Sequence, residues 1–143
     1  MMFPSDSRAT RRPLRFPIST FHFQLFPMIS HKFAWTDDMP ALARRASAIL
    51  ADKMNAESVW LYGSVARSDW NADSDIDLLV VVTDSEQPRH RRAQLAHRLV
   101  DEIHAPKDVI VLTRKEWDTE QLAPASLVNT VKREGVCLHE RGK

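Results

Sequence analysis

The sequence is poor in residue types whose abundance would indicate a particular class of protein. It has one cysteine, Cys137, so no disulfide can form within the chain, which is typical of proteins in a reducing compartment. It also has no apolar run approaching the roughly 20 residues that a membrane-spanning helix requires. We therefore expect a cytoplasmic protein that does not cross a membrane.

Charge of one sign is not in excess either. The 20 Lys and Arg residues nearly balance the 19 Asp and Glu residues, for a net charge of +1. This balance argues against a protein that binds nucleic acid or a membrane surface through its overall charge. The six histidines show no metal-ligand spacing. At 143 residues and 43% apolar, the chain is long enough for one compact domain.

The first 33 residues differ from the rest in composition. They hold five basic residues and one acid, which leaves 15 basic and 18 acidic residues for the remainder, and they contain all six phenylalanines. We treat residues 1–33 as a poorly ordered extension and 34–143 as the folded domain. The alternatives are an organellar transit peptide, a twin-arginine signal at Arg11-Arg12 and a translation start at Met28.

Patterns typical of helices and strands alternate through the domain. We expect helices from Asp37 or Asp38 to Met54 and at 85–103, 114–122 and 124–134, a short helix near Ser64, and strands at 58–63, 75–83, 107–113 and 136–140. Strand 75–83 is almost wholly apolar after Asp77, which indicates a central position. This order predicts an α/β (α+β) fold in which helices flank a small mixed β-sheet.

The helix predicted at 85–103 combines an apolar stripe with a strongly basic stretch. Leu95, Leu99, Val100 and Ile103 are predicted to form its inner stripe. The basic run 88–98 then forms a solvated face, and the alternative is a surface that binds RNA or an acidic partner. Farther along the chain, Cys137 is predicted to be a small buried apolar group.

Three aspartates lead into the strand predicted at 75–83. Asp75 and Asp77 lie on one face of that strand, about 7 Å apart along it, whereas Asp73 is expected in the preceding loop. Two such carboxylates raise each other's pKa unless a cation separates them, and Mg²⁺ prefers hard oxygen ligands. Asp108 opens the next strand in the same way. If the two strands are neighbours, the three carboxylates converge into a set suited to two-metal phosphoryl or nucleotidyl transfer.

A phosphate-binding element precedes these aspartates. Gly63 allows the backbone to approach a phosphate closely, and Ser64 with the amides of the next helix can donate hydrogen bonds to phosphate oxygens. Arg67, one turn later, can reach the same anion. The alternatives are a simple turn at Gly63-Ser64 and an Arg67 at the surface that is paired with Asp69 or Asp73.

These residues also carry a family resemblance. Gly63-Ser64, ten intervening residues and Asp75-Ile76-Asp77 match the G-S-x10-D-x-D signature of the DNA polymerase β-like nucleotidyltransferase superfamily. The stretch "GSVARSDWNADSDIDLLVVV" resembles most closely the minimal nucleotidyltransferases, the MNT proteins, many of which pair as antitoxins with a HEPN-domain ribonuclease. The family often has a glycine at the position of Ser68.

This resemblance implies a set of roles and a reaction. Asp75, Asp77 and Asp108 would hold two Mg²⁺ ions, Gly63 and Ser64 would hold the triphosphate of ATP, and AMP would pass to an acceptor hydroxyl. For MNT proteins the expected acceptor is a tyrosine of the HEPN toxin. Only residues 114–143 follow the third strand, which leaves little room for an acceptor-binding domain and favours a protein acceptor.

Two other functions remain as alternatives. One is a small-molecule nucleotidyltransferase of the aminoglycoside type, whose acceptor domain is supplied by dimerisation or by another chain. The other is a non-catalytic module that neutralises a toxin by binding alone. The intact set of acidic residues argues against the second alternative, because clustered, unpaired carboxylates cost stability.

Overall fold

The fold is taken from a computed structural model, which describes residues 39–142. The elements, in chain order, are α2 (Met39–Lys53), β1 (Ser58–Tyr62), α3 (Gly63–Arg67), β2 (Ile76–Val82), α4 (Arg89–Leu99), β3 (Lys107–Thr113), α5 (Arg114–Glu120), α6 (Leu127–Glu134) and β4 (Val136–Glu140). The extension predicted at 1–33 and the helix cap predicted at Asp37 or Asp38 lie outside the described residues. Within 39–142, none of the helices is long and apolar enough to cross a membrane.

The four strands form one mixed sheet in the order β3-β2-β1-β4. Strand β2 is parallel to β3 and antiparallel to β1, and β1 is also antiparallel to β4. All four predicted strands are therefore confirmed within one or two residues, as are the central position of β2 and the mixed α/β fold. β-Branched residues dominate β2, and this composition suits a strand that is covered on both faces.

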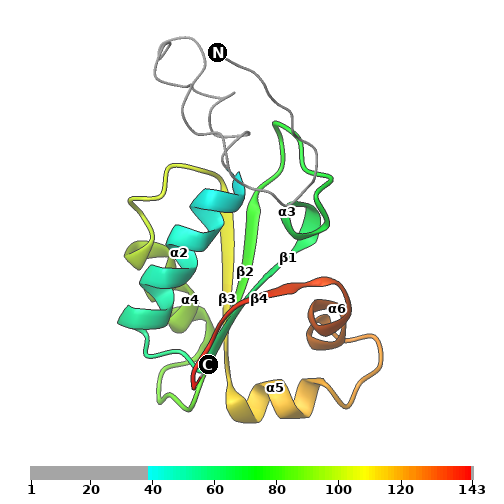
Figure 1. Cartoon of the computed structure of the whole chain (residues 1–143). Coiled ribbons are helices and arrows are strands. Elements are labelled where there is room, and N and C mark those ends of the chain that lie inside the picture. The colour runs from blue at the N-terminus through cyan, green and yellow to red at the C-terminus, as the bar shows by residue number, and fades with distance from the viewer. Residues whose placement is uncertain (1–38, 143) are drawn as a thin grey trace, which may run out of the picture.

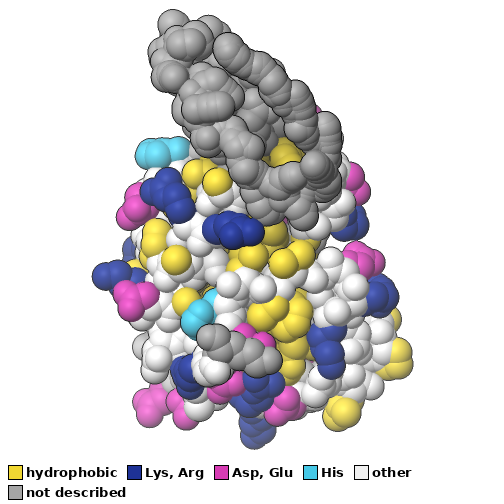
Figure 2. Space-filling view, in the orientation of Figure 1, with side chains coloured by type: hydrophobic (Ala, Val, Ile, Leu, Met, Phe, Trp, Pro, Cys, Tyr) yellow, Lys and Arg dark blue, Asp and Glu magenta, His cyan; other side chains and the backbone are white. Residues whose placement is uncertain are grey.

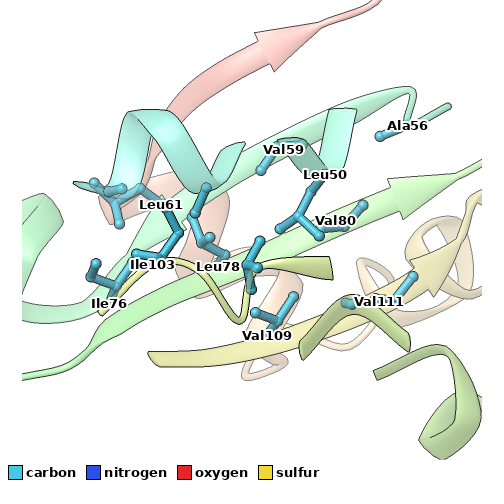
Figure 3. Packing of buried hydrophobic residues seen from close by; sticks show 14 of the residues in the cluster. Leu50, Ala56, Val59, Leu61, Ile76, Leu78, Val80, Ile103, Val109 and Val111 are labelled. Carbon is cyan, nitrogen blue, oxygen red and sulfur yellow. The ribbon is translucent and has the colours of Figure 1, made fainter. Parts of the chain in front are cut away.

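The first face of the sheet lies against α2 and α4 (Figure 1). Alternate residues of each strand point to it, because successive side chains of a strand face opposite ways. The close-up in Figure 3 shows Leu78 and Val80 of β2 near Val109 of β3 and Leu50 of α2. Each of these side chains is at most 1% exposed, and burying one side chain of this size stabilises the fold by about 1.5–3 kcal/mol.

The second face of the sheet is covered by α5 and α6 over only part of its length. Leu79 and Val81 of β2 pack there with Trp117 of α5 and Val131 of α6. The rings of Trp60 and Trp117 stack with their centroids 5.7 Å apart. Because α5 and α6 contact the part of β2 that follows Asp77, the beginning of β2 is left for polar residues.

Helix α4 differs from its prediction in length and in its inner face. It spans 89–99, and Leu95 is 41% exposed, so the predicted inner stripe was wrong at this residue. Val100 and Ile103 are buried as expected but follow the helix. Arg92, predicted on the solvated face, is only 5% exposed.

Arg92 is buried because its charge and its donors are satisfied by neighbouring elements. Its guanidinium forms two hydrogen bonds with the Glu116 carboxylate, at 2.9 and 2.8 Å, and donates to the Val111 carbonyl at 3.1 Å. Glu116 in turn completes a capping box with Thr113 at the start of α5. The arginine therefore ties α4 to the end of β3, a contact that helical periodicity alone does not reveal.

Strand β4 forms one edge of the sheet in the described part of the chain. Gly135 separates it from α6, and a β-carbon there would lie 2.6 Å from the Val131 carbonyl oxygen and 2.9 Å from that of Leu61. Cys137 is exposed, so its predicted burial was wrong. The reason is that β4 is a short edge strand whose first two residues are exposed.

Candidate active site

The acidic site lies where β2 and β3 begin, beyond the part of the sheet that α5 and α6 cover. Asp75 immediately precedes β2, and Asp77 is its second residue. In the register of the sheet, Asp77 is paired with Asp108 of β3 on one side and with Tyr62 of β1 on the other. Because paired residues present their side chains to the same face, the sheet aligns Tyr62, Asp77 and Asp108 in one row.

The charges in this row are coupled. Partial burial raises the pKa of Asp77 to about 6, and the nearby carboxylates of Asp75 and Asp108 add to this shift, while Arg67 opposes it. Burial also raises the pKa of Tyr62, with the same three aspartates contributing. Tyr62 is therefore a neutral phenol at physiological pH. The three predicted carboxylates are thus close enough to influence one another, as the strand spacing predicted.

The three carboxylates differ in their access to solvent. Asp75 is exposed, the side chain of Asp108 is 58% exposed, and Asp77 is half-buried between them. In residues 39–142, no three His, Cys, Asp or Glu side chains already stand close enough together to hold a metal ion. The donor set nevertheless fits Mg²⁺, because carboxylate oxygens are its preferred protein ligands and a cation offsets the repulsion among the carboxylates, which adds to the effect of burial on the Asp77 pKa.

Gly63 is required at its position for two reasons. Its φ of +76° is a conformation that L-residues with a side chain rarely adopt. A β-carbon built on it would also overlap Oδ2 of the Asp77 carboxylate, which occupies the space where a side chain at position 63 would lie. The backbone of this turn and the half-buried aspartate are therefore in contact, which brings the predicted phosphate-binding element and the acidic row into one site.

Helix α3 begins at this turn and carries the other predicted phosphate-binding residues. Ser64 is partly exposed in the first turn, and the N-cap residue Tyr62 makes no side-chain hydrogen bond to the helix. Arg67 pairs with Asp69 at 3.2 Å and lies 3.8 Å from Glu134. The ion pair with Asp69, which the sequence left open as the alternative to phosphate binding, is formed. The guanidinium remains exposed and near enough to Asp77 to lower its pKa.

The structure shows why Ser68, which follows Arg67, stands at a position where the family often has glycine. Ser68 caps α3 in the left-handed conformation, with φ +66° and ψ +26°. Glycine reaches this conformation without the steric cost that a β-carbon adds. The serine therefore adopts the left-handed turn conformation that glycine would take at this position.

One neighbour of the site could not be found from sequence. His97 of α4 lies at the edge of β3, where its Nε2 accepts a hydrogen bond from the Val109 amide at 3.3 Å and stands 4.0 Å from Asp108 Oδ1. In the sequence it is one histidine in a basic helix. Its place beside Asp108 depends on how α4 packs against β3, which no local pattern specifies.

A row of carboxylates at the start of two parallel strands, in contact with a glycine turn that opens a helix, is an arrangement suited to nucleotidyl transfer. Residues 45–143 match the family described as Polymerase beta, Nucleotidyltransferase. The chain belongs to this family and is a nucleotidyltransferase.

Solved structures are similar to this chain over most of its length. A candidate nucleotidyltransferase from Sulfolobus solfataricus is 30% identical, with a TM-score of 0.54 over 73% of this chain and 83% of that one. A toxin–antitoxin solved with AMP-PNP and a mutant of the toxin–antitoxin MntA-HpeT are 23% and 18% identical. Both have a TM-score of 0.45, over 70% of this chain and 74% of theirs. The chain has no significant match among curated proteins.

Proposed function

We propose that this chain transfers AMP from ATP to a tyrosine hydroxyl of a partner HEPN-type ribonuclease toxin, with Mg²⁺ as cofactor, and thereby acts as its antitoxin. The observation that carries the proposal is the contact between the Asp77 carboxylate and the Gly63 turn, with Asp75 and Asp108 beside it. This contact unites acidic side chains with a phosphate-binding turn. The resemblance of residues 63–82 to minimal nucleotidyltransferases supports the choice of acceptor.

Each residue of the site has a role in the proposed reaction. The backbone at Gly63 and the hydroxyl of Ser64 bind the triphosphate, and Arg67 adds positive charge beside it. Asp75, Asp77 and Asp108 would hold Mg²⁺, which supplies positive charge to the triphosphate and lowers the pKa of the acceptor hydroxyl.

The transfer itself is a substitution at the α-phosphorus of ATP. The acceptor oxygen forms a bond to this phosphorus, the bond to the bridging oxygen breaks, and pyrophosphate leaves. The hydroxyl proton passes to the exposed Asp108 carboxylate. Because Asp75 and Asp108 are exposed, the site at the start of β2 and β3 is open to a hydroxyl carried by another protein. An added AMP would place negative charge and bulk on the toxin.

The decisive experiment incubates the purified chain with ATP, Mg²⁺ and a HEPN toxin, and measures the mass of the intact toxin. We expect an increase of one or more AMP units, lost in the Asp77→Asn variant. Asp73→Asn is the matched control, because Asp73 lies in the exposed loop before β2 and does not contribute to the Asp77 pKa. A toxin left unmodified by the wild-type chain, or modified equally by Asp77→Asn, contradicts the proposal.

A second arm separates catalysis from binding. A double Asp75→Ala and Asp77→Ala variant is expressed together with the toxin in cells. We expect it to lose protection, because it lacks two of the three carboxylates. Full protection by this variant would assign the chain the role of a binding module, and modification of an aminoglycoside by the wild-type chain would assign it a small-molecule acceptor.

A further inference from the structure

The outer edge of β3 is satisfied by side chains of α4. Strand β3 ends the sheet on this side, so its outward amides and carbonyls have no strand partner among the described residues. Two residues of α4 take that place: His97 accepts from the Val109 amide, and Arg92 donates to the Val111 carbonyl. The two backbone groups belong to alternate residues, as expected for one edge of a strand. Helix α4 therefore closes this edge with its polar inner face.

His97 meets this edge next to Asp108. Its Nε2 accepts the Val109 amide at 3.3 Å, so in the neutral ring this nitrogen carries no proton and Nδ1 carries it. The same Nε2 is 4.0 Å from Asp108 Oδ1, beyond hydrogen-bonding distance. The ring therefore holds the backbone beside Asp108 without occupying the lone pairs of its carboxylate.

We propose that His97 is a positioning residue for Asp108: by binding the Val109 amide, it fixes the start of β3 and keeps the Asp108 carboxylate beside Asp77. The role rests on the proposed function, because it matters only if these carboxylates share a cation. Asp108 gains from such support, because its side chain is 58% exposed and its strand lies at the edge of the sheet.

A purely structural role of His97 and a positioning role predict effects of different size on stability and on metal affinity. One hydrogen bond from a partly exposed ring adds about 1 kcal/mol or less to the free energy of unfolding. Residues that orient metal ligands commonly change metal affinity by about 10–100-fold. A positioning role therefore predicts a large loss of cation affinity with a small loss of stability.

The test measures binding of Mn²⁺, used in place of Mg²⁺, by electron paramagnetic resonance in the presence of AMP-PNP. We expect His97→Leu, which removes the acceptor, to weaken Mn²⁺ binding about tenfold, and His97→Gln, which restores an acceptor, to recover most of it. His90→Leu, on the exposed face of α4, is the matched control. Arg92→Met loosens the same edge at Val111, away from Asp108, and is expected to lower stability with little effect on Mn²⁺ affinity.

A second readout does not depend on metal binding. Nitrogen-15 NMR of the wild-type chain reports which ring nitrogen of neutral His97 carries the proton, and hydrogen exchange reports the protection of the Val109 amide. We expect the proton on Nδ1 and a protected amide that His97→Leu exposes. A proton on Nε2 overturns the proposal.

The outcomes distinguish this inference from the proposed function. If the wild-type chain binds no Mn²⁺ with AMP-PNP, the proposed function fails and the positioning role fails with it. If the wild type binds and His97→Leu binds equally well, only the positioning role is overturned. It is overturned too if Arg92→Met weakens Mn²⁺ binding as much as His97→Leu does.

Discussion

The Asp77 carboxylate occupies the space where a β-carbon on Gly63 would lie, so the half-buried acid packs closely beside the turn that opens α3. No side chain can be added at position 63 without moving Asp77. This contact makes the spacing between the glycine and the second aspartate a geometric requirement. It also allows the two parts of the site to be tested by single substitutions.

Replacing Gly63 by alanine should abolish transfer. An alanine here would have to adopt a φ of +76°, at a cost of about 1–2 kcal/mol. Its β-carbon would also displace the Asp77 carboxylate. We expect at least about a hundredfold loss of AMP transfer, since small misplacements of reacting groups can cost this much. The matched control is Gly142→Ala, where φ is +92° and nothing lies within 4 Å of the added carbon. Equal activity of the two variants would show that the contact with Asp77 is irrelevant.

Ser68→Gly should stabilise the fold. The serine adopts φ +66° at the end of α3, where glycine avoids the steric cost of a β-carbon. We expect a gain of about 0.5–1 kcal/mol in the free energy of unfolding, measured by urea denaturation. Ser68→Ala keeps the β-carbon and should give no gain. A stabilisation of the same size in both variants would assign the effect to loss of the hydroxyl.

The Asp77 carboxyl should make the metal-free chain less stable as pH rises. Its pKa in the fold is about 6, above its ordinary value of 3.8, so the fold favours the protonated form. The penalty is absent below about pH 4 and grows as pH rises through 6. Asp77→Asn should therefore be more stable than the wild type at pH 7.5 by about 1 kcal/mol, a figure reduced for partial solvent exposure, and show no such gain at pH 4.

Urea denaturation in EDTA at the two pH values measures this difference. Asp84 is an exposed aspartate beyond the opposite end of β2, and Asp84→Asn serves as the control. Its free energy of unfolding should differ from that of the wild type by the same amount at both pH values. Added Mg²⁺ should reduce the difference in stability between Asp77→Asn and the wild type at pH 7.5, because it favours the charged carboxylate of the wild type. A pH-independent difference would mean that the burial of Asp77 carries no electrostatic cost.

Arg92→Ala should be among the more damaging substitutions outside the site. The change removes the guanidinium that pairs with Glu116 and leaves the Val111 carbonyl without the donation from Arg92, in a partly buried position. We expect a loss of about 2–4 kcal/mol in the free energy of unfolding. The comparison is Arg45→Ala, whose 3.5 Å pair with Glu102 joins side chains that are 57% and 65% exposed and should contribute less than about 1 kcal/mol. Similar losses in both would contradict a special role for the buried pair.

The face of the molecule drawn in Figure 2 gives no reason to expect strong binding through overall charge. On the face shown in Figure 2, basic and acidic side chains are interspersed and do not gather into a patch of one sign. The net charge of +1 agrees with this distribution.

The sequence alone determined the order of elements and the positions of the strands, because alternation along a strand and helical periodicity are local properties. It also indicated Gly63 and Asp108 through spacing and strand position. Only the tertiary structure decided that β3 lies parallel to β2, which pairs Asp108 with Asp77, and that Arg92 and His97 turn inward while Leu95 faces solvent. These arrangements depend on which strand edge α4 packs against, and the partners that make an inward arginine favourable are 19 and 24 residues away in the chain.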